Sequence, residues 1–159
     1  MIRALALVAA LCAPTAWSAG IGVIDVEAVM AASNQAQQAR QSWQQALAPI
    51  EQDIQQRIQQ GQALELQFQR ESDGAEKARL ESQLNELRVQ VLDLQQQAQT
   101  QLTQLENEFL AQQLPILESL VVQLAQENQL DLVVRADAVV WGDSSVNLSD
   151  DLLDRYNQP

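Results

Sequence analysis

Few residues in this chain could carry out catalysis near neutral pH. The sequence contains no His, and its only Cys, Cys12, lies in an apolar run near the N-terminus. His supplies most general acid–base chemistry near pH 7, and His and Cys are the usual zinc ligands. The paired carboxylates Asp150 and Asp151 follow Ser149, and a helix start capped by Ser149 accounts for them without catalysis. We therefore predict no catalytic, cofactor-binding or metal-binding residue, and no enzymatic activity.

Basic side chains that could contact a partner are unevenly placed. Residues 57–88 hold five basic and six acidic residues, a net charge of −1, in a chain whose net charge is −12. One interpretation is a nearly neutral surface that meets acidic partners without repulsion, and the other is pairing along a helix surface. The candidate contact residues are Arg57, Arg70, Lys77, Arg79 and Arg88.

The first 18 residues have the pattern of a cleaved secretory signal peptide. Arg3 precedes an apolar run over residues 4–13, and small residues occupy the positions that a signal peptidase reads. Cleavage after Ser18 fits better than cleavage after Ala19, which would put Trp17 at the minus-three position. The remaining residues, 19–159, are expected to form one domain without Cys and with a net charge of −13. Such an acidic surface disfavours binding to nucleic acid or anionic membranes.

A long antiparallel helical hairpin is predicted over residues 47–114, with its tip near residues 72–75. Ser72-Asp73-Gly74 interrupts the pattern, and Gly74 is expected to end the first helix in the left-handed conformation. Apolar residues recur at spacings of three and four on both sides of this break, as in a coiled-coil seam. They are Leu47, Ile50, Ile54, Ile58, Gly61, Leu64 and Phe68 in the first helix, and Leu80, Leu84, Leu87, Val91, Leu94 and Ala98 in the second.

Two prolines fall at irregular positions of this pattern. If the hairpin turns at residues 73–74, residue i faces roughly residue 147 − i. Pro49 then lies opposite Ala98, where the heptad spacing changes, and Pro115 lies opposite Ala32 and Ser33, where Ser33 is expected to cap a second helical stretch. The prolines are candidate hinges, or they are separate helix starts.

Short apolar runs on either side of the hairpin predict a small strand-bearing body over residues 19–46 and 115–159. Ile21–Val26 reads as a buried strand, and Leu132–Val134 with Ala138–Trp141 reads as a hairpin of buried strands. Three short strands leave edges and an apolar face uncovered, so we expect self-association through them. The residues expected to associate are Ile21, Val23, Ile24, Leu132, Val133, Val134, Val139, Val140 and Trp141.

The order of these segments resembles the Skp/OmpH family of chaperones. The segments that carry the likeness are IGVIDVEAVM, RESDGAEKARLE, DLVVRADAVVWGD and VNLSDDLL. The resemblance covers the chain after the signal peptide. It implies a mainly α fold with a small β part, in which helical arms extend from a strand body in a jellyfish-like homotrimer.

The resemblance also implies a periplasmic chaperone that holds unfolded outer-membrane proteins in a cavity between its arms, without ATP. The best-known members are basic, and lipopolysaccharide binding has been linked to basic residues on the returning arm. Residues 95–104 of this chain carry no charge, so no lipopolysaccharide site is predicted. The alternative function is a periplasmic coiled-coil scaffold or adaptor with one dedicated protein partner.

Overall fold

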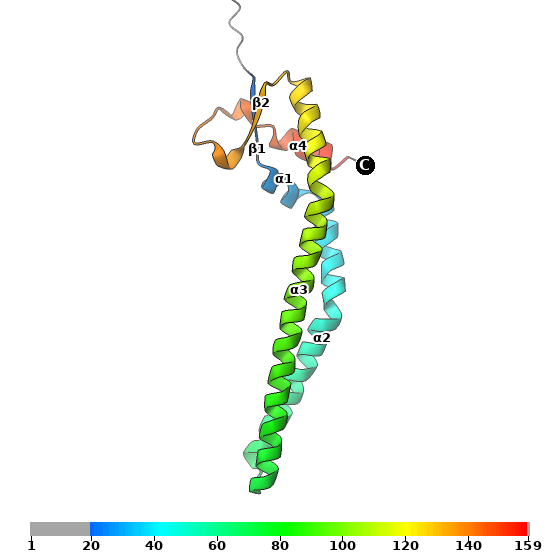
Figure 1. The fold of residues 1–159 in the computed structure, drawn as a ribbon, viewed down its shortest axis with the longest axis vertical. Helices are drawn as coiled ribbons and strands as arrows, with labels where there is room; N and C mark the ends of the chain where they lie inside the picture. The colour runs from blue at the N-terminus through cyan, green and yellow to red at the C-terminus, as the bar shows by residue number, and fades with distance from the viewer. Residues whose placement is uncertain (1–19, 159) are drawn as a thin grey trace, which may run out of the picture.

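A long helical hairpin extends from a small body at one end of the molecule (Figure 1). The computed structural model describes residues 20–158, so the predicted signal peptide lies outside the described residues. In chain order the elements are β1 (Ile21–Ile24), α1 (Val26–Ala32), α2 (Asn34–Arg70), α3 (Gly74–Glu127), β2 (Leu132–Arg135), two 3₁₀ turns (Ala136–Ala138 and Ser144–Val146) and α4 (Ser149–Tyr156).

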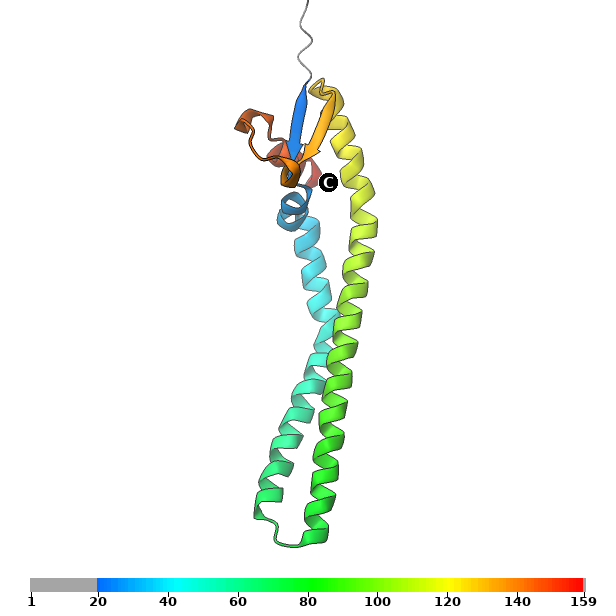
Figure 2. The ribbon, with the colours of Figure 1, turned by 60° about the vertical axis from the view of Figure 1, so that its left-hand side comes forward.

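The hairpin consists of α2 and α3, which run antiparallel as predicted. The seam residues of α3 from Leu80 to Ala98 are buried or half-buried, and so are those of α2 except Ile58, which is 38% exposed. The predicted register holds in the outer part of the hairpin, where Arg57 Nη1 donates to Gln90 Oε1 at 2.7 Å. Nearer the body it is shifted, because Trp43 packs against Phe109 and not near residue 104. The two helices lie close together in the middle of the hairpin and separate toward the turn (Figure 2).

Both prolines lie inside continuous helices. Pro49 is within α2 and Pro115 is within α3, a helix of 54 residues that enters the body without a break. The interpretation of the prolines as separate helix starts is therefore wrong. Each proline lacks the N–H that would bond to the carbonyl four residues earlier. Their role as hinges remains a prediction.

The body pairs the start of the described chain with a segment near its end. β1 and β2 are parallel, with Ile21 opposite Leu132 and Ile24 opposite Arg135. The predicted hairpin of strands, Leu132–Val134 with Ala138–Trp141, is wrong, because Ala136–Ala138 forms a 3₁₀ turn and residues 139–141 form no strand. The other edge of β1 instead meets Asn147 in an isolated bridge, and Leu148 N–H donates to Val23 O at 2.9 Å. Residues 139–141 have no strand partner among the described residues of the same protomer.

A single apolar cluster holds the body together. Strand β1, helices α1 and α4 and the last part of α3 supply its buried side chains. Gly22 lies close beside this cluster, where a Cβ would be 2.7 Å from the Leu130 side chain and 2.8 Å from that of Leu148, so a larger residue would displace both side chains. The buried members are Ile24, Val29, Leu117, Leu124, Leu148, Leu152 and Tyr156.

Of the two helix caps and one helix end that the sequence predicts, one cap is confirmed and the other two predictions are wrong. Ser33 caps α2 as predicted, since its hydroxyl accepts from Ala36 N–H. Ser149 does not cap α4: it is the first helical residue, and its hydroxyl accepts from Asp25 N–H at 2.9 Å, which links α4 to the N-cap residue of α1. Gly74 does not end α2 in a left-handed conformation, since it is the first residue of α3 and has no positive φ.

Candidate functional site

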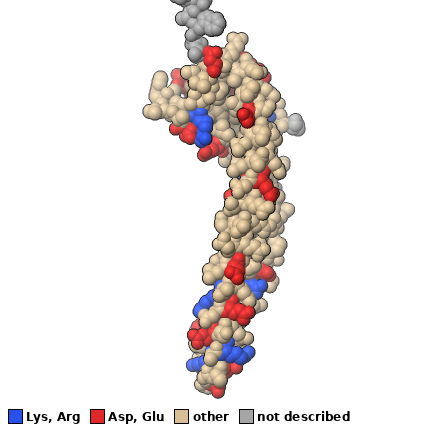
Figure 3. Space-filling view, in the orientation of Figure 1, with Lys and Arg blue, Asp and Glu red and all other residues tan. Residues whose placement is uncertain are grey.

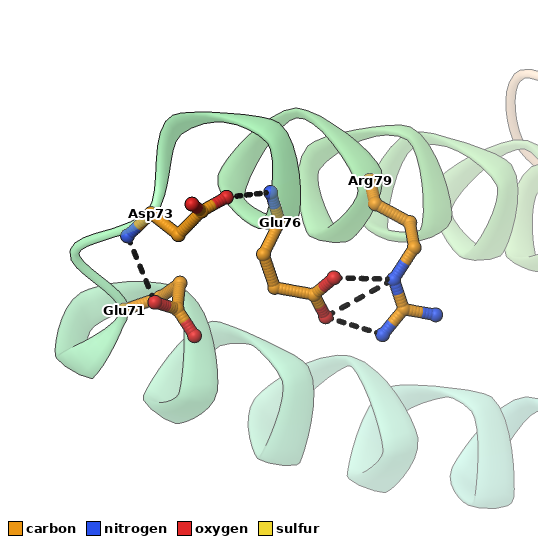
Figure 4. A network of polar contacts seen from close by, with 4 residues as sticks. All are labelled: Glu71, Asp73, Glu76 and Arg79. Carbon is orange, nitrogen blue, oxygen red and sulfur yellow. Dashed lines mark hydrogen bonds and ion pairs between the residues drawn. The ribbon is translucent and has the colours of Figure 1, made fainter.

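The turn between α2 and α3 is closed by a short polar network (Figure 4). Glu71 Oε1 accepts from the N–H groups of Ser72 and Asp73 at 2.8 and 2.9 Å. Asp73 Oδ1 accepts from Glu76 N–H at 2.9 Å, so Asp73 is the N-cap of α3. The Arg79 guanidinium donates to the Glu76 carboxylate, which lowers the pKa of Glu76. These contacts satisfy the backbone donors of Ser72, Asp73 and Glu76 and hold the tip of the hairpin in place.

The five candidate contact residues all lie in the outer half of the hairpin, interleaved with acidic side chains (Figure 3). Arg79 is paired with Glu76, and Arg57 lies 3.9 Å from Asp53. Lys77 Nζ lies 5.7 Å from the centre of the Phe68 ring. Arg57 and Arg79 thus have acidic neighbours on their own helices, and the contact of the five residues with a partner remains a prediction. Arg88 donates to Asn85 at 3.1 Å, and Arg70 is the last residue of α2.

An apolar groove, which we call the arm groove, lies between α2 and α3 in the same outer half. Its cavity volume is about 570 Å³. Sequence reasoning missed it, because the seam pattern marks which residues face the partner helix but not how far the helices separate. Its apolar lining residues are Ile58, Gly61, Leu84, Leu87, Val91 and Leu92. Its polar lining residues are Arg57, Gln62, Glu65, Arg88 and Gln95.

A second apolar surface covers part of the body. A groove of about 600 Å³, which we call the body groove, lies between α1 and the last part of α3. Most of its lining is aliphatic, and Glu27, Glu118 and Arg135 supply its charges. Its apolar lining residues are Val26, Met30, Leu110, Leu114, Leu117, Val121 and Val122.

The residues expected to associate fall into two groups. Ile24 is buried inside the protomer, and Val23, Val133, Val134 and Val139 are half-buried. The remaining four are exposed, and they lie on both strands and on the segment after the first 3₁₀ turn. These four are Ile21, Leu132, Val140 and Trp141.

The two tryptophans of the described chain have different surroundings. Trp43 is half-buried and meets Phe109 edge-on, with ring centres 5.8 Å apart. Trp141 is 86% exposed, so the prediction that it belongs to a buried strand is wrong for a single protomer. An exposed Val140-Trp141 pair is unusual on a monomer and is typical of an interaction surface.

Within residues 20–158, no three metal-ligating side chains come together in one place. In that same range, no helix is long and apolar enough to cross a membrane. The arrangement thus offers apolar grooves and an unpaired strand region as its interaction surfaces.

This is a mainly α protein in which a long helical hairpin extends from a small body of two parallel strands and two short helices. The profile of the outer membrane protein (OmpH-like) family matches residues 20–156, and the chain belongs to the OmpH-like family. The resemblance inferred from the sequence is thereby confirmed.

The fold is also similar to a solved structure. This is a crystal structure from Caulobacter crescentus CB15 of a protein described as a candidate outer membrane chaperone (OmpH-like). The TM-score is 0.56 at 15% sequence identity, and the match covers 87% of this chain and 84% of that chain. At this identity the likeness shows the fold alone. No curated protein has significant similarity to the sequence.

Proposed function

We propose that this protein is an ATP-independent periplasmic chaperone that holds unfolded outer-membrane proteins and prevents their aggregation. Membership of the OmpH-like family and the described role of the Caulobacter neighbour support a chaperone. The observation that carries the proposal is an elongated hairpin with an open apolar groove, attached to a body whose strand region has exposed apolar residues. Shallow apolar surfaces suit many weak contacts with different unfolded clients.

The working form would be a homotrimer assembled through the body, residues 19–46 and 115–159, with the arm, residues 47–114, left free. A two-stranded sheet is marginally stable alone in water. The second edge of β1 meets Asn147 and Leu148, whereas the second edge of β2 has no strand partner among the described residues. Ile21, Leu132, Val140 and Trp141 are exposed on the strands and on the segment that follows β2. Strand pairing between protomers would cover these side chains and give residues 139–141 the partner that one protomer does not supply.

Assembly can be tested with one pair of variants. Val140→Asp with Trp141→Asp should convert the trimer to monomers in multi-angle light scattering, since a charge in a dry interface is costly. The matched control is Val89→Asp with Leu92→Asp, which places the same charges on exposed positions of α3. A monodisperse wild-type monomer, or an intact trimer in the first variant, would remove this mode of assembly.

Holding activity can be tested by diluting a urea-unfolded outer-membrane barrel protein into the purified mature protein. The wild type should suppress light scattering without ATP and form a complex of defined mass. A variant in which Leu64 to Arg88 are replaced by a short turn should remain a trimer and lose the suppression, since every member of the body cluster lies outside this segment. Equal protection by the truncated protein would show that the arm does not hold clients. Failure of the wild type to protect any such client would favour a scaffold.

A further inference from the structure

Gly61 lies inside the part of α2 nearest the turn, without a packing reason. A Cβ built at this position meets nothing within 4 Å. Glycine is also among the least favourable residues in a helix interior. Close helix approach therefore does not require Gly61, yet it lines the arm groove opposite Leu84, Leu87 and Val91. Its main structural effect is to leave the groove open.

The dimensions of the arm groove select what can enter it. Its lining runs from Arg57 to Glu65 on α2 and from Leu84 to Gln95 on α3, which corresponds to roughly 12–16 Å at 1.5 Å per residue. A volume of about 570 Å³ over that length holds a single row of side chains and does not enclose a helix of ~10 Å diameter. The backbone carbonyls inside a helix are already bonded to its own N–H groups, whereas an extended segment also offers free carbonyls to donors in the groove.

Polar and charged groups accompany the apolar lining. Arg57, Arg88 and Glu65 belong to the groove together with two glutamines. In addition, Arg57 Nε is buried and has no acceptor among the described residues. A carbonyl or carboxylate of a bound segment would supply such an acceptor, and the two guanidinium groups favour acidic or hydroxyl side chains over basic ones.

Resting on the chaperone function above, we propose that the arm groove binds extended client segments in which apolar and polar residues alternate. In an extended chain, side chains on one face lie ~6.6–6.8 Å apart, so the groove accommodates two or three of them in succession. The intervening side chains then face the polar lining and solvent. Alternation of this kind is the pattern of strands that span a membrane as a barrel. The groove thus recognises the sequence period of the client as well as its apolar content.

The test fills the groove and leaves the rest of the arm unchanged. Gly61→Leu places a side chain in the groove, and the better helix propensity of Leu should leave the thermal unfolding midpoint equal or higher. Gln59→Leu is the matched control, because it adds the same side chain at an exposed position of α2 outside the groove lining. The probes are two labelled peptides of identical composition, one alternating Val with Thr and Asp, the other with all Val in one block. Binding to the full mature protein is measured by fluorescence anisotropy.

The expected result is preferential binding of the alternating peptide by the wild type and by the Gln59→Leu variant. Gly61→Leu should weaken that binding about tenfold while the protein stays folded. Equal affinities for both peptides, or an unchanged affinity in Gly61→Leu, would overturn the groove assignment. The chaperone function is tested separately, by whether the wild type suppresses aggregation of a barrel protein. If it does, only the groove assignment is wrong; if it does not, the proposed chaperone function is wrong as well.

Crosslinking gives an independent readout that does not depend on filling the groove. Gln62→benzoylphenylalanine places a photoreactive group in the lining, and Gln59→benzoylphenylalanine places it outside. With an unfolded barrel protein as client, the first should crosslink several-fold more strongly, and to segments of alternating pattern. Equal crosslinking from both positions, or capture of unpatterned segments, would contradict the proposal.

Discussion

Replacement of Leu152 by Ala should loosen the body and leave the arm helical. Leu152 is 0% exposed and lies in the cluster formed by β1, α1, α4 and the end of α3. Deleting a fully buried Leu side chain costs ~2–5 kcal/mol, through lost transfer energy and the cavity that remains. The cluster is small and close to solvent, so partial collapse is possible, and we expect about 3 kcal/mol. That is a large share of the ~5–15 kcal/mol that stabilises a typical domain.

Amide hydrogen exchange followed by mass spectrometry resolves the body from the arm. A loss of about 3 kcal/mol corresponds to roughly 10²-fold less protection in peptides that cover β1 and α4. The control is Leu66→Ala, the same substitution at a residue of α2 that is 54% exposed, with an expected change within ~0.5 kcal/mol. Both variants are compared at one protomer concentration, because assembly adds to apparent stability. Equal effects of the two substitutions would refute the view that the body cluster is the centre of stability.

Three further perturbations test local features. Arg155 donates to Glu127 at 2.9 Å and lowers the pKa of that carboxyl. The stability that this ion pair contributes is therefore present above the ordinary Glu pKa of about 4.3 and is lost as the pH falls through the lower pKa of the folded state. The difference in free energy of unfolding between the wild type and Glu127→Gln should shrink from pH 6 toward pH 3. Gln129 has a φ of 53° just after α3, so Gln129→Gly should raise the free energy of unfolding by up to about 1 kcal/mol, measured by urea titration. Pro49→Ala restores a backbone donor within α2 and should narrow the spread of spin-label distances along the arm; an unchanged spread would show that Pro49 is not a hinge.

The sequence predicted the hairpin well because its signals are local and repeated. Leu80, Leu84, Leu87 and Val91 keep a helical spacing over several turns, and only a second helix can cover such a narrow stripe. The break at Ser72-Asp73-Gly74 was also visible, although its geometry was not. Gly74 was expected in a left-handed conformation because glycine often ends helices, but Asp73 caps the following helix instead.

The body was predicted less well because its pairing joins distant segments. Val139, Val140 and Trp141 have the composition of a buried strand, but whether such a run pairs depends on an available edge. In the protomer, the chain leaves β2 in a 3₁₀ turn and does not fold back along that strand, and the second edge of β1 is occupied by Asn147 and Leu148. The Ser149 hydroxyl was likewise assigned to its own helix, whereas it bonds to Asp25, 124 residues earlier. The spacing of residue types along the sequence does not predict a contact between residues so far apart in the chain.

The arm groove could not be found from the sequence for a further reason. Gly61 falls on the seam, where a small residue ordinarily signals that two helices approach closely. Only the structure shows that a Cβ at Gly61 would have no atom of the partner helix within 4 Å. The signal available in the sequence was the Gly itself, placed inside a long run of strong helix formers where no turn is needed.

The parallel pairing of β1 with β2 fixes the order in which a newly made chain can fold. Gly20 and Asp131, which bond at the start of this sheet, are separated by 111 residues, and the whole hairpin lies between them. As the chain is synthesised from its N-terminus, β1 must wait for nearly the entire polypeptide before its partner appears. The hairpin contacts are local and form quickly, whereas closing so long a loop is slow. A truncated translation product that ends before Leu132 would therefore have an arm but no body, and its β1 would be unpaired.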